Sequence, residues 1–76
     1  MINSYDVIGI GTELLDKLKK QHISNECELS IKVNKENLLK LDEDLYYRQF
    51  PEGKDYVPTD GEIVLKFENL TIVVKE

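Results

Sequence analysis

The sequence predicts a small α+β domain with the order α-β-α-β-β, in which two helices pack on one face of a three-stranded sheet. Three observations predict it. The segment Cys27–Val33 alternates apolar and polar residues, as a half-buried strand does. Two segments, near residues 4–21 and 35–49, space their apolar residues for one face of a helix. The C-terminal segment, 63–76, alternates twice with a change of phase, which is typical of a β-hairpin.

The chain has 76 residues, enough for one domain, 1–76, and no more. Its 41% of hydrophobic and 33% of charged residues are typical of a globular domain. No run of about 18 apolar residues is long enough to span a membrane, and the first residues do not resemble a signal peptide. We therefore expect a cytoplasmic protein.

The first helix is expected from about Ser4 to Gln21, with Ser4 as its candidate N-cap. Gly9 and Gly11 each weaken a helix by roughly 1 kcal/mol relative to alanine. Two alternatives follow. The helix runs throughout and the glycines allow close packing, or it begins only at Thr12 and the preceding residues are extended.

The same glycines raise the question of a phosphate site. The stretch IGIGTELLDKL, with its match at Gly9 to Leu15, resembles the start of the molybdopterin-binding domain family, where a strand ends in a glycine turn. The resemblance implies a phosphate-binding turn. The second signature of that family, a phosphate loop rich in glycine and threonine, has no counterpart here. The dinucleotide fingerprint also fails, because Leu14 stands where the third glycine belongs. We therefore expect no cofactor.

Asn34 is a suitable N-cap for the second helix, expected from about Lys35 to Gln49. Glu36 and Lys40, and likewise Asp44 and Arg48, are four residues apart in the favourable order for ion pairs. The connection from the first strand through this helix is a candidate for a right-handed parallel crossover.

The C-terminal hairpin is predicted by its change of phase. A two-residue turn at Glu68-Asn69 places six apolar residues on one face, and Asn69 is the residue expected to accept positive φ. The predicted pairs are Phe67 with Leu70, Leu65 with Ile72, and Ile63 with Val74. The other face is mostly polar around Val64 and Val73.

The net charge of −5 is unevenly distributed. The segment Glu36–Glu62 has eight acidic and three basic residues, so it carries the whole net charge. An acidic chain is a poor ligand for nucleic acid or anionic lipid, which attract basic surfaces. We therefore expect no direct nucleic-acid or membrane binding, and a basic protein as partner.

The sequence indicates no enzyme. The single cysteine, Cys27, excludes an intrachain disulfide, and with the single histidine, His22, it leaves too few ligands for a usual zinc site. Asp42, Glu43 and Asp44 fan out around a helix by about 100° each, so they do not converge on one ion. No nucleophile–base pair is evident, and we predict no catalytic or metal-binding residue.

Aromatic residues gather inside the acidic segment, where the second helix meets the long loop Phe50–Gly61. Tyrosine and arginine are enriched at the centres of protein interfaces. The alternative is that Phe50 and Tyr56 fold back to cap the sheet edge. The candidate partner-binding residues are Asp42, Asp44, Tyr46, Tyr47, Arg48, Asp55 and Tyr56.

Two functions are compatible with these patterns. The first is a small, acidic, non-catalytic interaction domain, similar in size and charge to inhibitors that phages and mobile elements direct at host proteins. The second is a homo-oligomer with a structural or regulatory role, which associates through the hairpin edge or the Val64/Val73 face.

Overall fold

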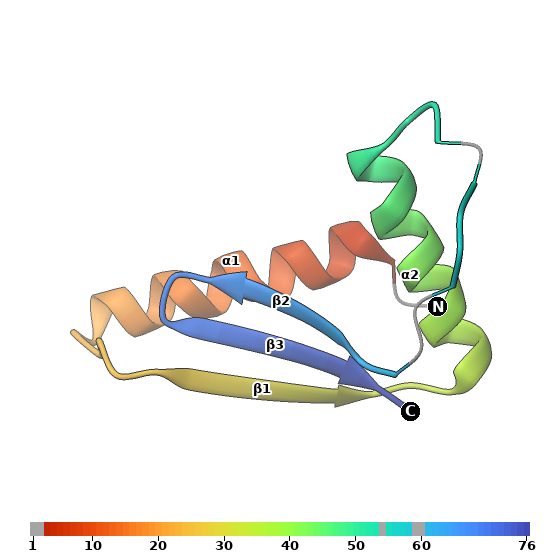
Figure 1. The fold of residues 1–76 in the computed structure, drawn as a ribbon. Helices are drawn as coiled ribbons and strands as arrows, with labels where there is room; N and C mark the ends of the chain where they lie inside the picture. Colours follow the sequence, from red (N-terminus) through yellow and green to blue (C-terminus); the bar gives the residue numbers. More distant parts are fainter. Residues whose placement is uncertain (1–2, 54, 59–60) are drawn as a thin grey trace.

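The computed structural model describes residues 3–53, 55–58 and 61–76. In Figure 1, one helix lies along the three-stranded sheet and the other stands at its end. Both contribute to one core with the sheet, so the predicted α+β class is confirmed. The elements follow the predicted order: α1 (Ser4–Lys20), β1 (Cys27–Lys32), α2 (Lys35–Gln49), β2 (Ile63–Phe67) and β3 (Leu70–Lys75).

The strand order in the sheet is β1-β3-β2, so the last strand is central. β2 and β3 form the predicted hairpin in the predicted register, with Phe67 opposite Leu70 and Ile63 opposite Val74. β1 runs parallel to β3, and therefore antiparallel to β2, the next strand along the chain. The expected parallel crossover is therefore wrong for the connection through α2, because that connection returns to the end of the sheet that it left. This is why α2 stands at the end of the sheet (Figure 1).

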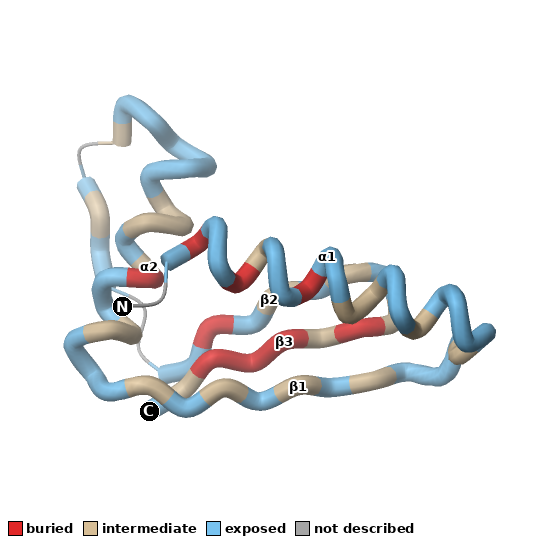
Figure 2. Tube along the Cα trace, turned by 180° about the vertical axis from the view of Figure 1, so that it is seen from behind, coloured by how far each residue is buried: buried red, intermediate tan, exposed pale blue. Residues whose placement is uncertain are grey.

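The core is centred on β3. Figure 2 shows the buried positions along β3 and on the side of α1 that faces it. All six hairpin residues predicted for the core belong to it, with Leu65 and Phe67 partly exposed at its border. The fully buried apolar side chains come from three elements: Val7 of α1, Leu41 of α2, and Leu70, Ile72 and Val74 of β3.

α1 is helical through both glycines, so the alternative of a helix that begins at Thr12 is wrong. Its N-cap is Asn3 instead of the expected Ser4. The Asn3 side chain accepts a hydrogen bond of 3.0 Å from the Asp6 N–H, and the Asp6 carboxylate accepts one of 3.0 Å from the Asn3 N–H. This reciprocal capping box satisfies N–H groups that the first turn leaves unpaired. Ser4 is therefore the first helical residue, and it is fully buried.

Gly11 is a point of close contact between α1 and β2. A Cβ atom at this position would lie 2.5 Å from the Phe67 ring, whereas one at Gly9 would have no neighbour within 4 Å. Close packing therefore explains Gly11 and not Gly9. The GxG stretch lies inside a helix, so it forms no glycine turn and does not share the strand–turn arrangement of the molybdopterin-binding family.

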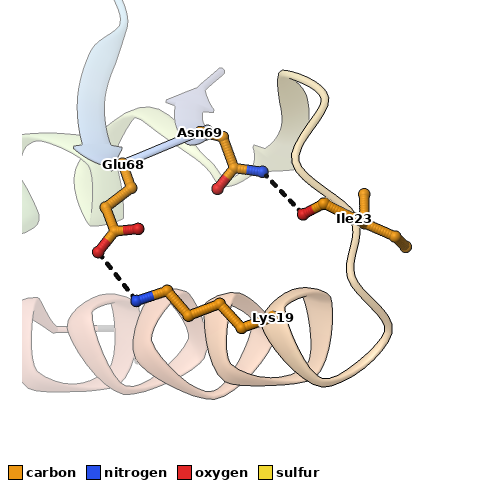
Figure 3. A network of polar contacts seen from close by, with 4 residues as sticks. All are labelled: Lys19, Ile23, Glu68 and Asn69. Carbon is orange, nitrogen blue, oxygen red and sulfur yellow. Dashed lines mark hydrogen bonds and ion pairs between the residues drawn. The ribbon is translucent and has the colours of Figure 1, made fainter.

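The hairpin turn is joined to the end of α1 (Figure 3). The Asn69 amide donates hydrogen bonds to the carbonyl oxygens of Asn25, at 2.8 Å, and Ile23, at 3.4 Å. Glu68 forms an ion pair of 2.9 Å with Lys19. Glu68, with φ of 55°, takes the positive φ that we expected at Asn69. Positive φ at the first of the two turn residues alone is the pattern of a type II′ turn, which explains why Glu68 and not Asn69 adopts it.

Candidate partner-binding surface

α2 packs against the core through Leu38, Leu41 and Leu45. The Asn34 side chain caps the helix by accepting a hydrogen bond of 2.8 Å from the Asn37 N–H, as predicted. The predicted pair of Glu36 and Lys40 is formed at 3.1 Å, and Leu41 is fully buried. In Figure 1 the second half of the helix rises away from the sheet. The aromatic residues that follow Leu45 are therefore carried beyond the main core.

Four aromatic rings gather at this raised end, and we call them the aromatic cluster: Tyr46, Tyr47, Phe50 and Tyr56. Tyr46 is central, with ring centroids at 5.3 Å to Tyr47, 5.2 Å to Phe50 and 5.3 Å to Tyr56. Tyr46 and Tyr47 meet edge to face at 85°. Such aromatic pairs are each worth about 0.5–1.5 kcal/mol beyond the burial of area. The rings therefore hold one another in place outside the main core.

The chain after α2 turns back onto Tyr46. The Gly53 N–H donates a hydrogen bond of 2.9 Å to the Phe50 carbonyl. A Cβ at Gly53 would lie 2.7 Å from a carbon of the Tyr46 ring, so this close contact requires glycine. Tyr46, Phe50 and Gly53, together with Gln49, Pro51 and Glu52, line a shallow cavity of about 490 Å³.

Tyr56 connects the returning segment to α2. Its hydroxyl donates a hydrogen bond of 2.7 Å to the Asp42 carboxylate. Removal from water, and then the bond to Asp42, raise the pKa of Tyr56 to about 12. The neutral phenol is therefore the form that the fold stabilises, and this contact joins Tyr56 to α2.

Asp44 and Arg48 point to a different neighbour, the start of α1. The Ser4 N–H donates a hydrogen bond of 2.7 Å to the Asp44 carboxylate, and Arg48 Nε donates one of 2.9 Å to the Ser4 hydroxyl oxygen. The Arg48 guanidinium also lies 3.9 Å from the centre of the Tyr5 ring, in cation–π geometry. The Ser4 hydroxyl and then the Ser4 N–H lower the pKa of Asp44. The two residues that the sequence pairs with each other thus meet through Ser4.

The structure divides the predicted site into two groups. Asp42, Tyr46, Tyr47 and Tyr56 lie together around the aromatic cluster, with Asp55 exposed beside them. Asp44 and Arg48 hold α1 against α2. The sequence-based site set left out Phe50 and Gly53, although the sequence offers a signal for them in a glycine three residues after an aromatic residue.

The alternative, in which Phe50 and Tyr56 cap the sheet edge, agrees with the position of Tyr56 and not with that of Phe50. Phe50 lies on Tyr46 and is 49% exposed. Tyr56 and Val57 line a groove with the residues of β2, Ile63 to Leu65. None of the four rings belongs to the main core.

The described residues contain no group of three or more histidine, cysteine or acidic side chains placed to hold a metal ion. No helix in this part of the chain is long and apolar enough to cross a membrane. Comparison with protein-family profiles, with curated proteins and with solved structures gave no significant match. The proposals below therefore depend on the sequence and structure of this chain alone.

Proposed function

We propose that this chain is a small, non-catalytic interaction domain whose aromatic cluster binds a basic protein. One observation carries the proposal: a preformed group of rings stands outside the main core, within the segment that holds all of the net charge. Aromatic side chains in a rigid setting are the usual anchors of protein interfaces.

The cluster offers apolar area that is already ordered. Phe50 is 49% exposed, Tyr47 is 37% exposed and the adjacent Val57 is 75% exposed. The contacts among the rings, the Gly53 turn and the bond of Tyr56 to Asp42 hold these groups before any partner arrives. Binding then costs little side-chain and loop ordering, so more of the contact energy appears as affinity.

The charge around the cluster indicates the chemistry of the partner. Glu43, Glu52 and Asp55 are exposed beside the rings. An acidic rim accelerates encounter with a basic surface and makes the association sensitive to salt, since the attraction is screened beyond about 8 Å at physiological ionic strength.

Among basic proteins we favour a nucleic-acid-binding protein, which would make this chain an inhibitor of the kind that phages and mobile elements direct at host enzymes. A surface that attracts phosphates also attracts an array of carboxylates. The support for this finer assignment is the small size of the chain and the concentration of its charge.

The test separates the rings from the charge. Tyr47→Ser with Phe50→Ser removes the exposed apolar area and keeps the net charge, while Val64→Ser removes an exposed apolar residue of the sheet and serves as the matched control. Proteins captured by the wild type from the native cells are identified, purified and titrated against all three forms at two salt concentrations.

We expect the double variant to weaken binding of the purified partner at least about tenfold, since truncating interface anchors costs about 2 kcal/mol or more. The Val64 variant should bind as the wild type does. Equal binding by all three forms, or a partner whose affinity does not fall with salt, would reject the proposal.

A further inference from the structure

β1 is an edge strand of the sheet, and its outer side is uncovered by the described residues (Figures 1 and 2). The core-side residues of β1, Cys27, Leu29 and Ile31, are each only half buried. An exposed strand edge with half-buried apolar residues is a template for pairing with another strand.

The backbone hydrogen bonds fix which residues face outward. The N–H of Cys27 donates to the Asn69 carbonyl at 2.8 Å, and the N–H of Val33 donates to the Lys75 carbonyl at 2.9 Å. The backbone N–H and C=O groups of successive residues point alternately to the two sides of a strand. The residues of β1 whose backbone groups point to the outer edge are therefore Glu28, Ser30 and Lys32. These three present the donors and acceptors that a further strand would use.

We infer that two copies of this chain pair antiparallel through β1, around a twofold axis at Ser30, and form one continuous sheet. In this register the outward-facing Ser30 residues are opposite each other, and Glu28 of each copy is opposite Lys32 of the other. On the core side, Leu29 is opposite Ile31 of the second copy. Apart from the central Ser30 pair, the cross-strand pairs are thus charge-complementary or apolar, and such pairs stabilise antiparallel sheets.

The register is specific. Because the outward groups repeat every two residues, the neighbouring registers differ by two positions. One of them places Glu28 opposite Ser30, and the other places Ser30 opposite Lys32. Only the register centred on Ser30 pairs both Glu28 and Lys32 with opposite charges. A twofold contact of this kind is closed, so it stops at the dimer.

The other edge of the sheet, β2, is less accessible. Tyr46 and Gln49 of α2, together with Val57, line a groove with Ile63 to Leu65 of that strand. A partner strand along β2 would have to enter this groove, whereas one along β1 would not. We therefore assign self-association to the β1 edge, and not to the hairpin edge that the sequence suggested.

The charge and shape of the chain favour the same contact. β1 lies outside the acidic segment, in the part of the chain where seven acidic and seven basic residues balance, so two copies meet without net repulsion at this edge. The radius of gyration is 13.4 Å, whereas a compact chain of this length has about 11 Å. Pairing through β1 gives the half-buried residues of an open, elongated chain new apolar neighbours.

The experiment is sedimentation equilibrium of the full chain up to high micromolar concentration. We expect the wild type to be a dimer. Lys32→Glu and Glu28→Lys each place like charges opposite each other at two symmetric positions and should raise the dissociation constant about tenfold. The double variant Glu28→Lys with Lys32→Glu exchanges the charges and should restore the dimer. Lys66→Glu on β2 makes the same change of net charge as Lys32→Glu and should have no effect.

Circular dichroism confirms that each variant is folded before its mass is interpreted. A wild type that is monomeric at high micromolar concentration overturns the inference, as does a charge exchange that fails to restore the dimer, or an equal effect of Lys66→Glu and Lys32→Glu. Tyr47→Ser with Phe50→Ser should leave the dimer intact, so this result is independent of the proposed binding function.

Discussion

The backbone N–H of Ser4 donates a hydrogen bond of 2.7 Å to the Asp44 carboxylate, across 40 positions of the chain. This bond joins the first turn of α1 to the middle of α2. A carboxylate at a helix N-terminus also interacts favourably with the helix dipole. Because α2 carries the aromatic cluster, the bond contributes to the placement of the proposed binding surface.

Asp44→Ala should destabilise the fold by about 1–3 kcal/mol, because it leaves the N–H of the fully buried Ser4 without its acceptor. Urea denaturation measures this loss. Glu43→Ala, at the exposed neighbouring position, is the control and should change stability by less than about 0.5 kcal/mol. Equal effects of the two substitutions would show that the Ser4–Asp44 bond is unimportant.

The stability should also depend on pH through Asp44. The folded state lowers the pKa of this carboxyl below its ordinary value of 3.8. Between the two pKa values the unfolded chain binds more protons, so the contribution is fully present above pH about 4–5 and is lost as the pH falls through the folded pKa. Asp44→Asn should be less stable than the wild type at neutral pH, with a difference that shrinks on acidification. Urea titrations at several pH values measure it, and a constant difference would contradict the assignment.

The two glycines of α1 should respond in opposite ways to the same substitution. Gly11→Ala forces a Cβ to within 2.5 Å of the Phe67 ring, so it should lower the melting temperature despite the better helix propensity of alanine. Gly9→Ala meets no atom within 4 Å and should stabilise by up to about 1 kcal/mol. If both variants were stabilised, the close contact of α1 with β2 would be refuted.

One of the four tyrosines should ionise at a higher pH than an ordinary tyrosine does. The pKa of Tyr56 is raised to about 12 by removal from water and by its bond to Asp42. Phenolate absorbance during alkaline titration should therefore show a late phase that disappears in Tyr56→Phe. Asp42→Asn should move this phase to lower pH, because it removes the charge and the best acceptor. A late phase that persists without Tyr56 would assign it to another ring.

The local elements were predictable because their signals lie within a few residues of one another. The change of phase at Glu68-Asn69 fixes the hairpin register, since a shift of one residue would turn every apolar side chain outward. Asn34 marks the start of α2 for a similar reason, because its side chain reaches an N–H only three residues away.

The long-range contacts were not predictable from one sequence. Nothing local indicates that Asp44 binds the N–H of Ser4, or that Arg48 lies over Tyr5. The start of α1 at Ser4 was predicted, but its N-cap was misassigned by one residue, because Asn3 and Ser4 are both good caps and the bond to Asp6 decides between them. The aromatic cluster was predicted as a group of residues, but its centre, Tyr46, is defined only by ring contacts that the folded chain brings about.

The most direct test of the proposed function is an amide NMR footprint of the labelled chain with its purified partner. We expect the signals that change to lie between residues 42 and 58, and we expect a higher salt concentration to reverse the changes. Signals of β1 should stay unchanged apart from any effect of self-association. A footprint on the polar face of the sheet, around Val64 and Lys66, with the aromatic cluster unaffected, would contradict the account.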